Sequence, residues 1–285
     1  MDMLRAQMDA LADANADRGR CIEIPTRSGN RHARLFWPKE AEGSRPIYID
    51  FHPGGFVSGS PELDSAFNQR VSDELGIVVI APSYRLAPEA MYPADKEDAI
   101  DAVRHIVANA DAYGIDPGRM AIGGHSAGGN IAASLALQLK DDPSVHLACV
   151  LLDYPALDLY TDARMKPQPE GCINPRMAAA FDSLYRDAEH GRDVFLSPIF
   201  AQEDDLRGLA PHIIVTAEGD SLRGEAEEYA SRLMAAGVEV MARRFLGVRH
   251  GFTIDVGDDE DGVRDARDQA IRFMVRGLGM HMLDG

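Results

Sequence analysis

Hydrophobic and polar positions along this chain alternate between two kinds of pattern. Short runs rich in Ile, Val and Tyr, typical of buried strands, are followed by stretches whose apolar residues recur every three or four positions, as in a helix. Strands are expected at 21–26, 32–37, 46–51, 76–81, 119–123, 147–153, 211–217 and 238–245. Helices are expected at 1–17, 63–75, 93–113, 126–140, 222–236 and 260–276. This order predicts an α/β fold with a mostly parallel eight-stranded sheet and helices on both faces.

Residues 156–197 interrupt this alternation. They contain Pro167, Pro169 and Pro175, and a helical pattern follows near 177–187. Long proline-rich connections often form lids or substrate loops, and a surface excursion without function is the alternative. We therefore expect a single domain over residues 1–285, with small helical cap elements at about 1–19 and 156–197.

Composition and charge exclude several classes of protein. The chain is 45% hydrophobic and 26% charged, an ordinary globular balance. No apolar run approaches the ~18 residues that span a bilayer, and the acidic N-terminal segment does not resemble a secretory signal. The net charge of −17 repels phosphates and anionic lipids, so nucleic acid and membranes are not expected partners.

The three cysteines do not suggest a metal or disulfide framework. Cys21, Cys149 and Cys172 are odd in number, far apart and without CxxC spacing. Neither a metal nor an organic cofactor is expected. Free thiols of this kind favour a reducing, cytoplasmic location.

The strongest chemical signal is Gly124-His125-Ser126-Ala127-Gly128, a G-x-S-x-G between an expected strand and an expected helix. That context is the one in which the motif forms a nucleophile elbow, with the serine on a sharp, strained turn. A glycine-rich turn with an ordinary N-cap serine is the alternative. The neighbouring His125 side chain is expected to point away from Ser126 and to be structural.

A second signal is the loop Phe51-His52-Pro53-Gly54-Gly55-Phe56, directly after an expected strand. Two successive glycines expose backbone N–H groups, and with the N–H of Ala127 they would form an oxyanion hole. The same residues are also good turn formers, so the loop alone does not distinguish the two interpretations. The G-x-S-x-G motif about 70 residues later favours the functional one.

A serine nucleophile requires a base and an acid that orients the base, in the chain order Ser, Asp or Glu, His. His250 follows the last expected strand and is favoured over His281, which lies five residues from the chain end and is expected to be frayed. Asp220 follows the strand at 211–217 and is favoured as the acid. Its rivals are Glu218 and Asp153.

With these pieces together, residues 45–275 resemble the hormone-sensitive-lipase-like family of α/β-hydrolases, which are carboxylesterases. The resemblance rests on the His52–Gly55 loop, Tyr84–Glu89, the Ser126 elbow, Asp220–Arg223 and His250–Phe252. Three positions depart from the family pattern: Pro53 replaces a glycine, His125 an aspartate, and Ser221 a proline. None of these changes removes a catalytic group.

The resemblance and the motifs together predict a serine carboxylesterase acting on a small-molecule ester through Ser126, His250 and Asp220, with Gly54, Gly55 and Ala127 binding the oxyanion. Short acyl chains are expected because the cap is thin. An amide-directed serine hydrolase such as an arylformamidase is the main alternative, and a non-catalytic binding protein on this fold is the other. Whether the chain forms a homo-oligomer is left open.

Overall fold

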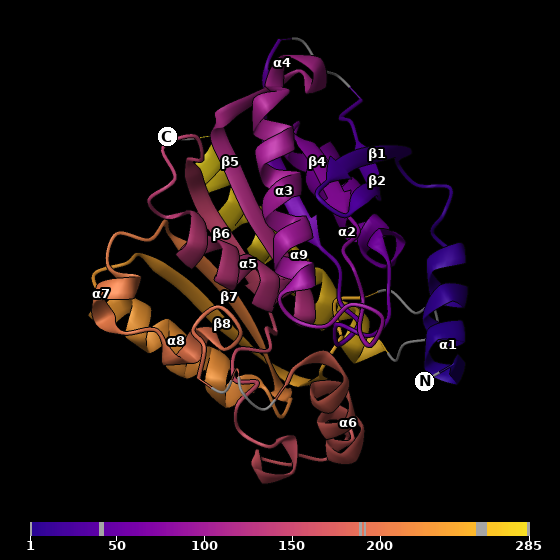
Figure 1. Cartoon of the computed structure of the whole chain (residues 1–285), viewed down its shortest axis with the longest axis vertical. Helices are drawn as coiled ribbons and strands as arrows, with labels where there is room; N and C mark the ends of the chain where they lie inside the picture. Colours follow the sequence, from indigo (N-terminus) through magenta and orange to yellow (C-terminus); the bar gives the residue numbers. More distant parts are fainter. Residues whose placement is uncertain (1, 40–42, 188–189, 191, 255–260, 284–285) are drawn as a thin grey trace.

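The computed structural model describes residues 2–39, 43–187, 190, 192–254 and 261–283 (Figure 1). Its strands are β1 Arg20–Thr26, β2 Gly29–Phe36, β3 Arg45–Phe51, β4 Val78–Pro82, β5 Ile115–His125, β6 Leu147–Asp153, β7 His212–Gly219 and β8 Val240–Arg249. Its helices are α1 Asp2–Asp13, α2 Ser65–Leu75, α3 Ala94–Ala108, α4 Ala110–Tyr113, α5 Ala127–Leu139, α6 Pro175–Tyr185, α7 Glu203–Leu206, α8 Arg223–Ala235 and α9 Asp261–Met282.

The strands form one eight-stranded sheet in the order β1-β2-β4-β3-β5-β6-β7-β8. The pairs β1–β2 and β2–β4 are antiparallel, and the remaining pairs are parallel. The first antiparallel pair is the hairpin that the turn chemistry around Gly29 favours. The expected mostly parallel eight-stranded sheet is confirmed.

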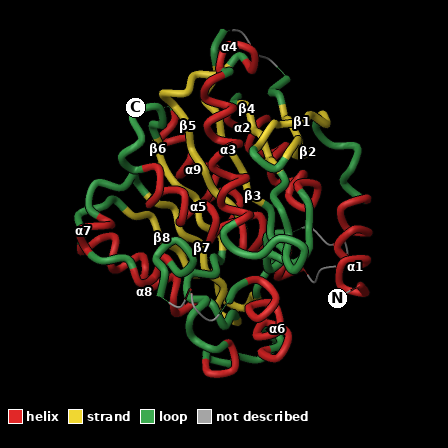
Figure 2. Tube along the Cα trace, viewed as in Figure 1, coloured by secondary structure: helices red, strands yellow, loops and turns green. Residues whose placement is uncertain are grey.

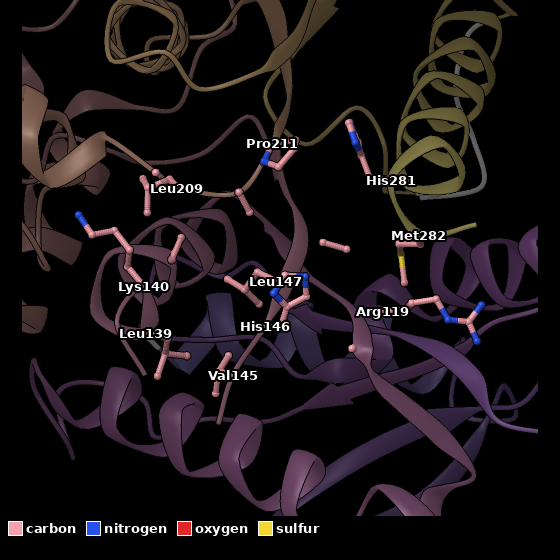
Figure 3. A pocket seen from close by; sticks show the side chains of 15 residues that line it. Arg119, Leu139, Lys140, Val145, His146, Leu147, Leu209, Pro211, His281 and Met282 are labelled. Carbon is pink, nitrogen blue, oxygen red and sulfur yellow. The ribbon is translucent and has the colours of Figure 1, made fainter. Parts of the chain in front are cut away.

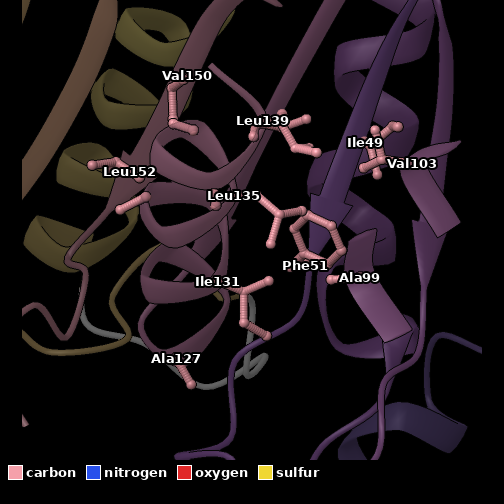
Figure 4. Close-up of a cluster of buried hydrophobic side chains, with 14 of the residues drawn as sticks. Ile49, Phe51, Ala99, Val103, Ala127, Ile131, Leu135, Leu139, Val150 and Leu152 are labelled. Atoms are coloured by element: carbon pink, nitrogen blue, oxygen red, sulfur yellow. The ribbon is translucent and has the colours of Figure 1, made fainter. Parts of the chain in front are cut away.

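Alternate strand residues enter two different cores, because successive side chains point to opposite faces of a sheet. Ile47 and Ile49 of β3 pack with the face covered by α3, α5 and α8, whereas Tyr48 packs with the face covered by α2 and α9. Figure 2 shows these helices lying over the sheet. Figure 4 shows Ile131 and Leu135 of α5 packed among Ile49, Phe51 and Val103 in the first core.

The sheet is buried on both faces, so its carboxyl-terminal edge is the place where loops can form a site. The helix α6, which belongs to the insertion that sequence patterning separates from the sheet, lies beyond that edge (Figure 1). Among the described residues, no helix combines the length and the apolar character needed to cross a bilayer.

Candidate active site

Ser126 lies between β5 and α5 in a conformation that few L-residues adopt. Its φ is 54° and its ψ is −113°. The Ser126 N–H donates to the Asp153 carbonyl oxygen at 2.9 Å, and the Ser126 carbonyl accepts from the N–H of Ala156 at 3.2 Å. These bonds hold the strained turn between two neighbouring strand ends, which is the elbow that the motif predicts.

The elbow approaches the end of β3 and the following His52–Gly55 loop more closely than any side chain at Gly128 would allow. A Cβ at Gly128 would lie 1.7 Å from the Phe51 carbonyl oxygen and 2.8 Å from that of His52. Only glycine fits such a contact. The last glycine of the motif therefore presses the start of α5 against the end of β3 and brings Ser126 beside the Gly54–Gly55 loop.

That loop is fixed by its own hydrogen bonds. The Gly54 carbonyl accepts from the N–H of Val57 at 3.2 Å, the N–H of Ser58 at 3.1 Å and the Ser58 hydroxyl at 2.9 Å. In a planar trans peptide the next N–H points opposite to the carbonyl, so the N–H of Gly55 points away from Val57 and Ser58. Gly54 has a φ of 132°, a region open to glycine.

The buried side chain of His52 is a neutral imidazole that hydrogen-bonds to the backbone of the same loop. Burial lowers its pKa to about 4. Its Nδ1 lies 2.8 Å from the Pro53 carbonyl oxygen, so Nδ1 carries the hydrogen and donates it. The ring stacks on Tyr84 with centroids 4.1 Å apart, and the Tyr84 hydroxyl donates to the His52 carbonyl at 2.7 Å.

Ser126, His250 and Asp220 lie in one hydrogen-bonded row. The Nε2 atom of His250 is 2.9 Å from Ser126 Oγ, and its Nδ1 atom is 2.8 Å from Asp220 Oδ2. Asp220 Oδ1 accepts from the N–H of Leu222 at 3.0 Å, which holds the carboxylate in place. The three residues directly follow β5, β8 and β7, at the same edge of the sheet.

The environment of His250 makes it a stronger base. Burial by itself lowers its pKa, but the negative charge and hydrogen bond of Asp220 outweigh burial and raise the pKa above the ordinary 6.5. The side chain remains 15% exposed, so it faces both its partners and the adjoining cavity.

The two rival acids have other partners. Glu218 is exposed and accepts from the N–H of Gly247 at 2.9 Å. Asp153 is fully buried and binds His125 and Thr253. Among the described residues, neither makes a hydrogen bond to His250.

A cavity of about 240 Å³ opens on Ser126 and His250 and is also lined by Gly54, Gly55 and Ala127. Its walls are largely apolar, and many of the residues that form them come from the insertion, with Ile173, Met177 and Phe181 among them. Met8 of α1 and residues of the loops that carry the site, such as Tyr154 and Leu222, complete the walls. Lys166 and Asp182 also line the cavity. The wall residues from α1 and the insertion carry no sequence motif, and only their place in the expected cap elements at about 1–19 and 156–197 indicated them.

Lys166, one of the two charged residues in the cavity wall, is held by buried partners. Lys166 donates to Glu225 at 2.7 Å and to the Asp158 carbonyl at 2.6 Å, and both Lys166 and Glu225 are 8% exposed. Burial raises the pKa of Glu225 to about 7. Burial also raises the pKa of Asp182 to about 6, against the opposing charge of Lys166.

A larger cavity of about 490 Å³ lies at the opposite edge of the sheet (Figure 3). It is lined by Arg119, Leu147 and Pro211, near the starts of strands, and by His281. The structure corrects the expectation for His281, which belongs to the last turn of α9 rather than to a frayed tail. Helix α9 continues because its residues pack on the sheet. His281 nevertheless lies far from Ser126.

His125 is buried among three carboxylates. Its Nδ1 is 2.8 Å from Asp153 Oδ2, and its Nε2 is 3.8 Å from Asp50 and 3.9 Å from Asp64. Asp50, Asp64 and His125 have the donor set of a cation site. Burial lowers the pKa of His125, but Asp64, Asp153 and Asp50 together raise it to about 10. The imidazolium itself therefore supplies the positive charge here, and a metal ion would have to displace its proton.

The sequence has an acidic run at Asp258–Asp261, which is expected to complement the dipole at the N-terminus of the last helix. Apart from Asp261, this run lies outside the described residues. Asp261 is the first residue of α9.

Comparison with known proteins places this architecture in a family. The model of the alpha/beta hydrolase fold family matches residues 48–254. Carboxylesterase NlhH of Mycobacterium tuberculosis is 32% identical over 223 residues, which are 77% of this chain and 70% of that protein. Ethyl acetate hydrolase of Pseudomonas putida is 30% identical and covers 97% of this chain and 88% of its own length.

The solved structures agree. The hyperthermophilic esterase from the archaeon Pyrobaculum calidifontis superposes with a TM-score of 0.84 at 32% identity, over 97% of this chain and 92% of that chain. A bacterial heroin esterase gives a TM-score of 0.85 at 32% identity, over 96% of this chain and 90% of that chain. The chain therefore belongs to the α/β-hydrolase fold family, in the hormone-sensitive-lipase-like branch that its motifs resemble.

Proposed function

We propose that this protein is a serine carboxylesterase that hydrolyses short-chain carboxylic esters through an acyl-enzyme. The observation that carries the proposal is the row of two hydrogen bonds from Ser126 through His250 to Asp220, opening into a cavity beside the glycine loop. The enzyme class, a carboxylic ester hydrolase, is the one that the named relatives share.

In the first half-reaction Ser126 Oγ attacks the ester carbonyl carbon while His250 Nε2 takes the hydroxyl proton. The N–H groups of Gly54, Gly55 and Ala127 bind the oxyanion that forms. The carbonyl then re-forms, the C–O bond to the alcohol breaks, and His250 returns its proton to the leaving alcohol. Asp220 holds the tautomer of His250 with the hydrogen on Nδ1 and stabilises the imidazolium.

Water completes the cycle by the same route. It attacks the acyl-enzyme carbonyl as His250 takes one of its protons, and the collapse of the second oxyanion releases the carboxylic acid and the free Ser126 hydroxyl. The cavity of about 240 Å³ is small for a ligand pocket, which supports a short acyl chain.

The nucleophile is tested by replacing its hydroxyl alone. Ser126→Ala should retain the fold and lose more than ~99% of kcat on a short p-nitrophenyl ester, because loss of one triad member removes most of the rate enhancement. It should also abolish covalent labelling by a fluorophosphonate. Ser231→Ala, at an exposed position on α8, is the matched control and should behave as the native protein.

The acid is tested by a second set of variants. Asp220→Asn should lower kcat by about 10³–10⁴ through the wrong tautomer of His250. Asp153→Asn and Glu218→Gln should have much smaller effects, since neither bonds to His250. A deeper loss at either position would transfer the acid's role to it. Faster turnover of a matched formamide than of the ester would instead favour the amide-directed alternative.

A further inference from the structure

Four buried polar side chains form a network beneath Ser126 and His250. Asp153 Oδ2 accepts from His125 Nδ1 at 2.8 Å and from the Thr253 hydroxyl at 2.5 Å. The Tyr154 hydroxyl lies 2.6 Å from Thr253 Oγ1. His125, Asp153, Tyr154 and Thr253 are each at most 4% exposed, so the hydrogen bonds among them are shielded from solvent.

The direction of each hydrogen bond follows from the chemistry of the groups. Asp153 Oδ2 accepts, so Thr253 donates its single hydroxyl hydrogen to Asp153. Thr253 Oγ1 then accepts from the Tyr154 hydroxyl. The threonine hydroxyl therefore bridges Asp153 and the tyrosine hydroxyl, whose other contact, to His125 Nδ1, is longer at 3.5 Å. A residue without a hydroxyl at position 253 would remove the shorter of these two contacts of the tyrosine.

The network connects the two residues that react. His125 precedes Ser126, whose N–H donates to the Asp153 carbonyl oxygen at 2.9 Å. Thr253 lies three residues after His250, in a turn closed by the bond from the N–H of Phe252 to the Arg249 carbonyl at 3.3 Å. Asp153 thus contacts both the elbow and the loop that carries the base.

The aromatic ring of Tyr154 packs directly against His250. The ring centroids are 4.8 Å apart and the planes meet at 61°. Tyr154 has a φ of 36°, uncommon for a bulky residue, so its backbone is turned to bring the ring to this place. Asp220 fixes the rotation of His250 through Nδ1, whereas Tyr154 limits the tilt of its face.

We propose that Thr253 and Tyr154 are positioning residues, which hold the His250 ring at the distance and angle for proton transfer with Ser126 by anchoring its loop to Asp153. The proposal rests on the proposed function, in which His250 is the base. Thr253 does not line the cavity, whereas Tyr154 forms part of its wall beside His250, and in the proposal both act through His250. A misplacement of about 1 Å in such a group can cost roughly 10²-fold in rate.

Thr253→Val is the first test, because it removes the hydroxyl at nearly constant shape. We expect kcat on a short ester to fall about tenfold or more while KM changes less than about twofold, since the cavity wall is retained. Thr253→Ser keeps the hydroxyl and should restore kcat to within about threefold of the native value. The rate of fluorophosphonate labelling of Ser126 should follow the same order.

Tyr154→Phe separates the hydroxyl from the ring. It keeps the packing against His250 but loses the anchor to Thr253, so its kcat should lie between those of the native protein and Thr253→Val. Tyr229→Phe is the matched control. Tyr229 is also fully buried, and its hydroxyl has no hydrogen-bond partner among the described residues, so kcat should not change.

A purely structural role would give a different result. The melting temperature of Thr253→Val would then fall while kcat per folded molecule, counted by active-site labelling, stayed at the native value, and the proposal would be overturned. If Thr253→Val does not fold, equal kcat for Tyr154→Phe and the native protein would overturn it as well. Failure of the proposed function is recognised separately, by ester turnover that survives Ser126→Ala.

Discussion

At the scale of single residues, the strained backbone of Ser126 is the feature on which the site depends. A residue in a sparsely populated region costs about 1–3 kcal/mol and persists only where its surroundings determine it. Here the Ser126 N–H donates to the Asp153 carbonyl, and the Ser126 carbonyl accepts from the N–H of Ala156. These two partners lie on either side of the turn after β6. The strain therefore fixes the direction of Oγ toward His250 before any substrate binds.

The raised pKa of His250 predicts how activity depends on pH. In the proposed mechanism His250 acts as the base only when neutral, so kcat/KM should fall as pH decreases through the pKa of His250, with a midpoint above 6.5. Asp220→Asn removes the charge that raises this pKa and should move the midpoint of its residual activity to lower pH. Glu218→Gln should leave the midpoint unchanged. An acid limb below pH 6.5 in the native protein would contradict this assignment.

Pro53 is the clearest departure from the family pattern in the oxyanion loop. It has no N–H, but the donors assigned here are Gly54, Gly55 and Ala127. Pro53→Gly should therefore leave kcat within several-fold and lower the free energy of unfolding by about 0.4–1 kcal/mol, through a freer unfolded chain. One ester assay and one thermal melt measure both effects.

The opposite substitution is the control for that prediction. Gly55→Pro should nearly abolish hydrolysis, because it removes an N–H and because the φ of 62° at Gly55 is closed to proline. A rise of ~100-fold in kcat for Pro53→Gly would mean that the missing N–H was needed as an oxyanion donor.

At the scale of elements, the periodic patterns predicted the sheet, its flanking helices and the strand ends that carry the site. The boundary of α9 shows where pattern reading fails. The pattern predicts a last helix that ends near residue 276. Gly277 and Gly279 follow that point, and glycine is a poor helix former. In the structure it runs to Met282, and a Cβ at Gly277 would lie 2.8 Å from Ile213 Cδ1. Close packing on β7 outweighs local propensity here.

Contacts across long sequence separations were beyond prediction for a different reason. The motifs predict Ser126, Asp220 and His250 as site residues, because each has a characteristic local context. Thr253 and Tyr154 have no such context, since their role depends on which strand ends become neighbours in the sheet. The pairing of Lys166 with Glu225 likewise joins the insertion to α8. Only the three-dimensional structure brings these residues together.

Helix α6 predicts how acyl-chain preference can be changed. Phe181 lies over Gly55 and lines the cavity, so the native protein should prefer acyl chains of roughly two to six carbons. Phe181→Ala should shift the optimum to longer chains, since each additional buried CH₂ contributes about 0.8 kcal/mol where apolar surface receives it. A series of p-nitrophenyl esters from two to sixteen carbons measures the shift.

Phe195→Ala, outside α6, is the matched control for the Phe181→Ala prediction. Phe195 is 37% exposed and does not line the cavity, so this variant should keep the native chain-length profile. Best turnover by the native protein on chains of twelve carbons or more would contradict the preference for short acyl chains.

At the scale of the whole molecule, the net charge of −17 should make stability depend on salt. Like charges in excess repel one another in the compact state, and ions screen that repulsion over a Debye length of about 10 Å at 0.1 M. The melting temperature at pH 7 should therefore rise by a few degrees between about 10 mM and 200 mM NaCl. Glu228→Lys, at an exposed position, should weaken this dependence, whereas Glu228→Gln should weaken it less. A melting temperature that falls with salt would show that specific ion pairs outweigh the general repulsion.

The division of the cavity between two parts of the chain has a consequence for how such a protein can diversify. The groups assigned to bond making and breaking lie at the ends of sheet strands, whereas much of the wall that meets the rest of the ester comes from one contiguous stretch, residues 156–182. Recombination or insertion within that stretch can retune selectivity without disturbing the reactive groups. Exchanging residues 156–182 between family members should therefore change the substrate range while the reaction stays the same. This holds for laboratory variants and for evolution.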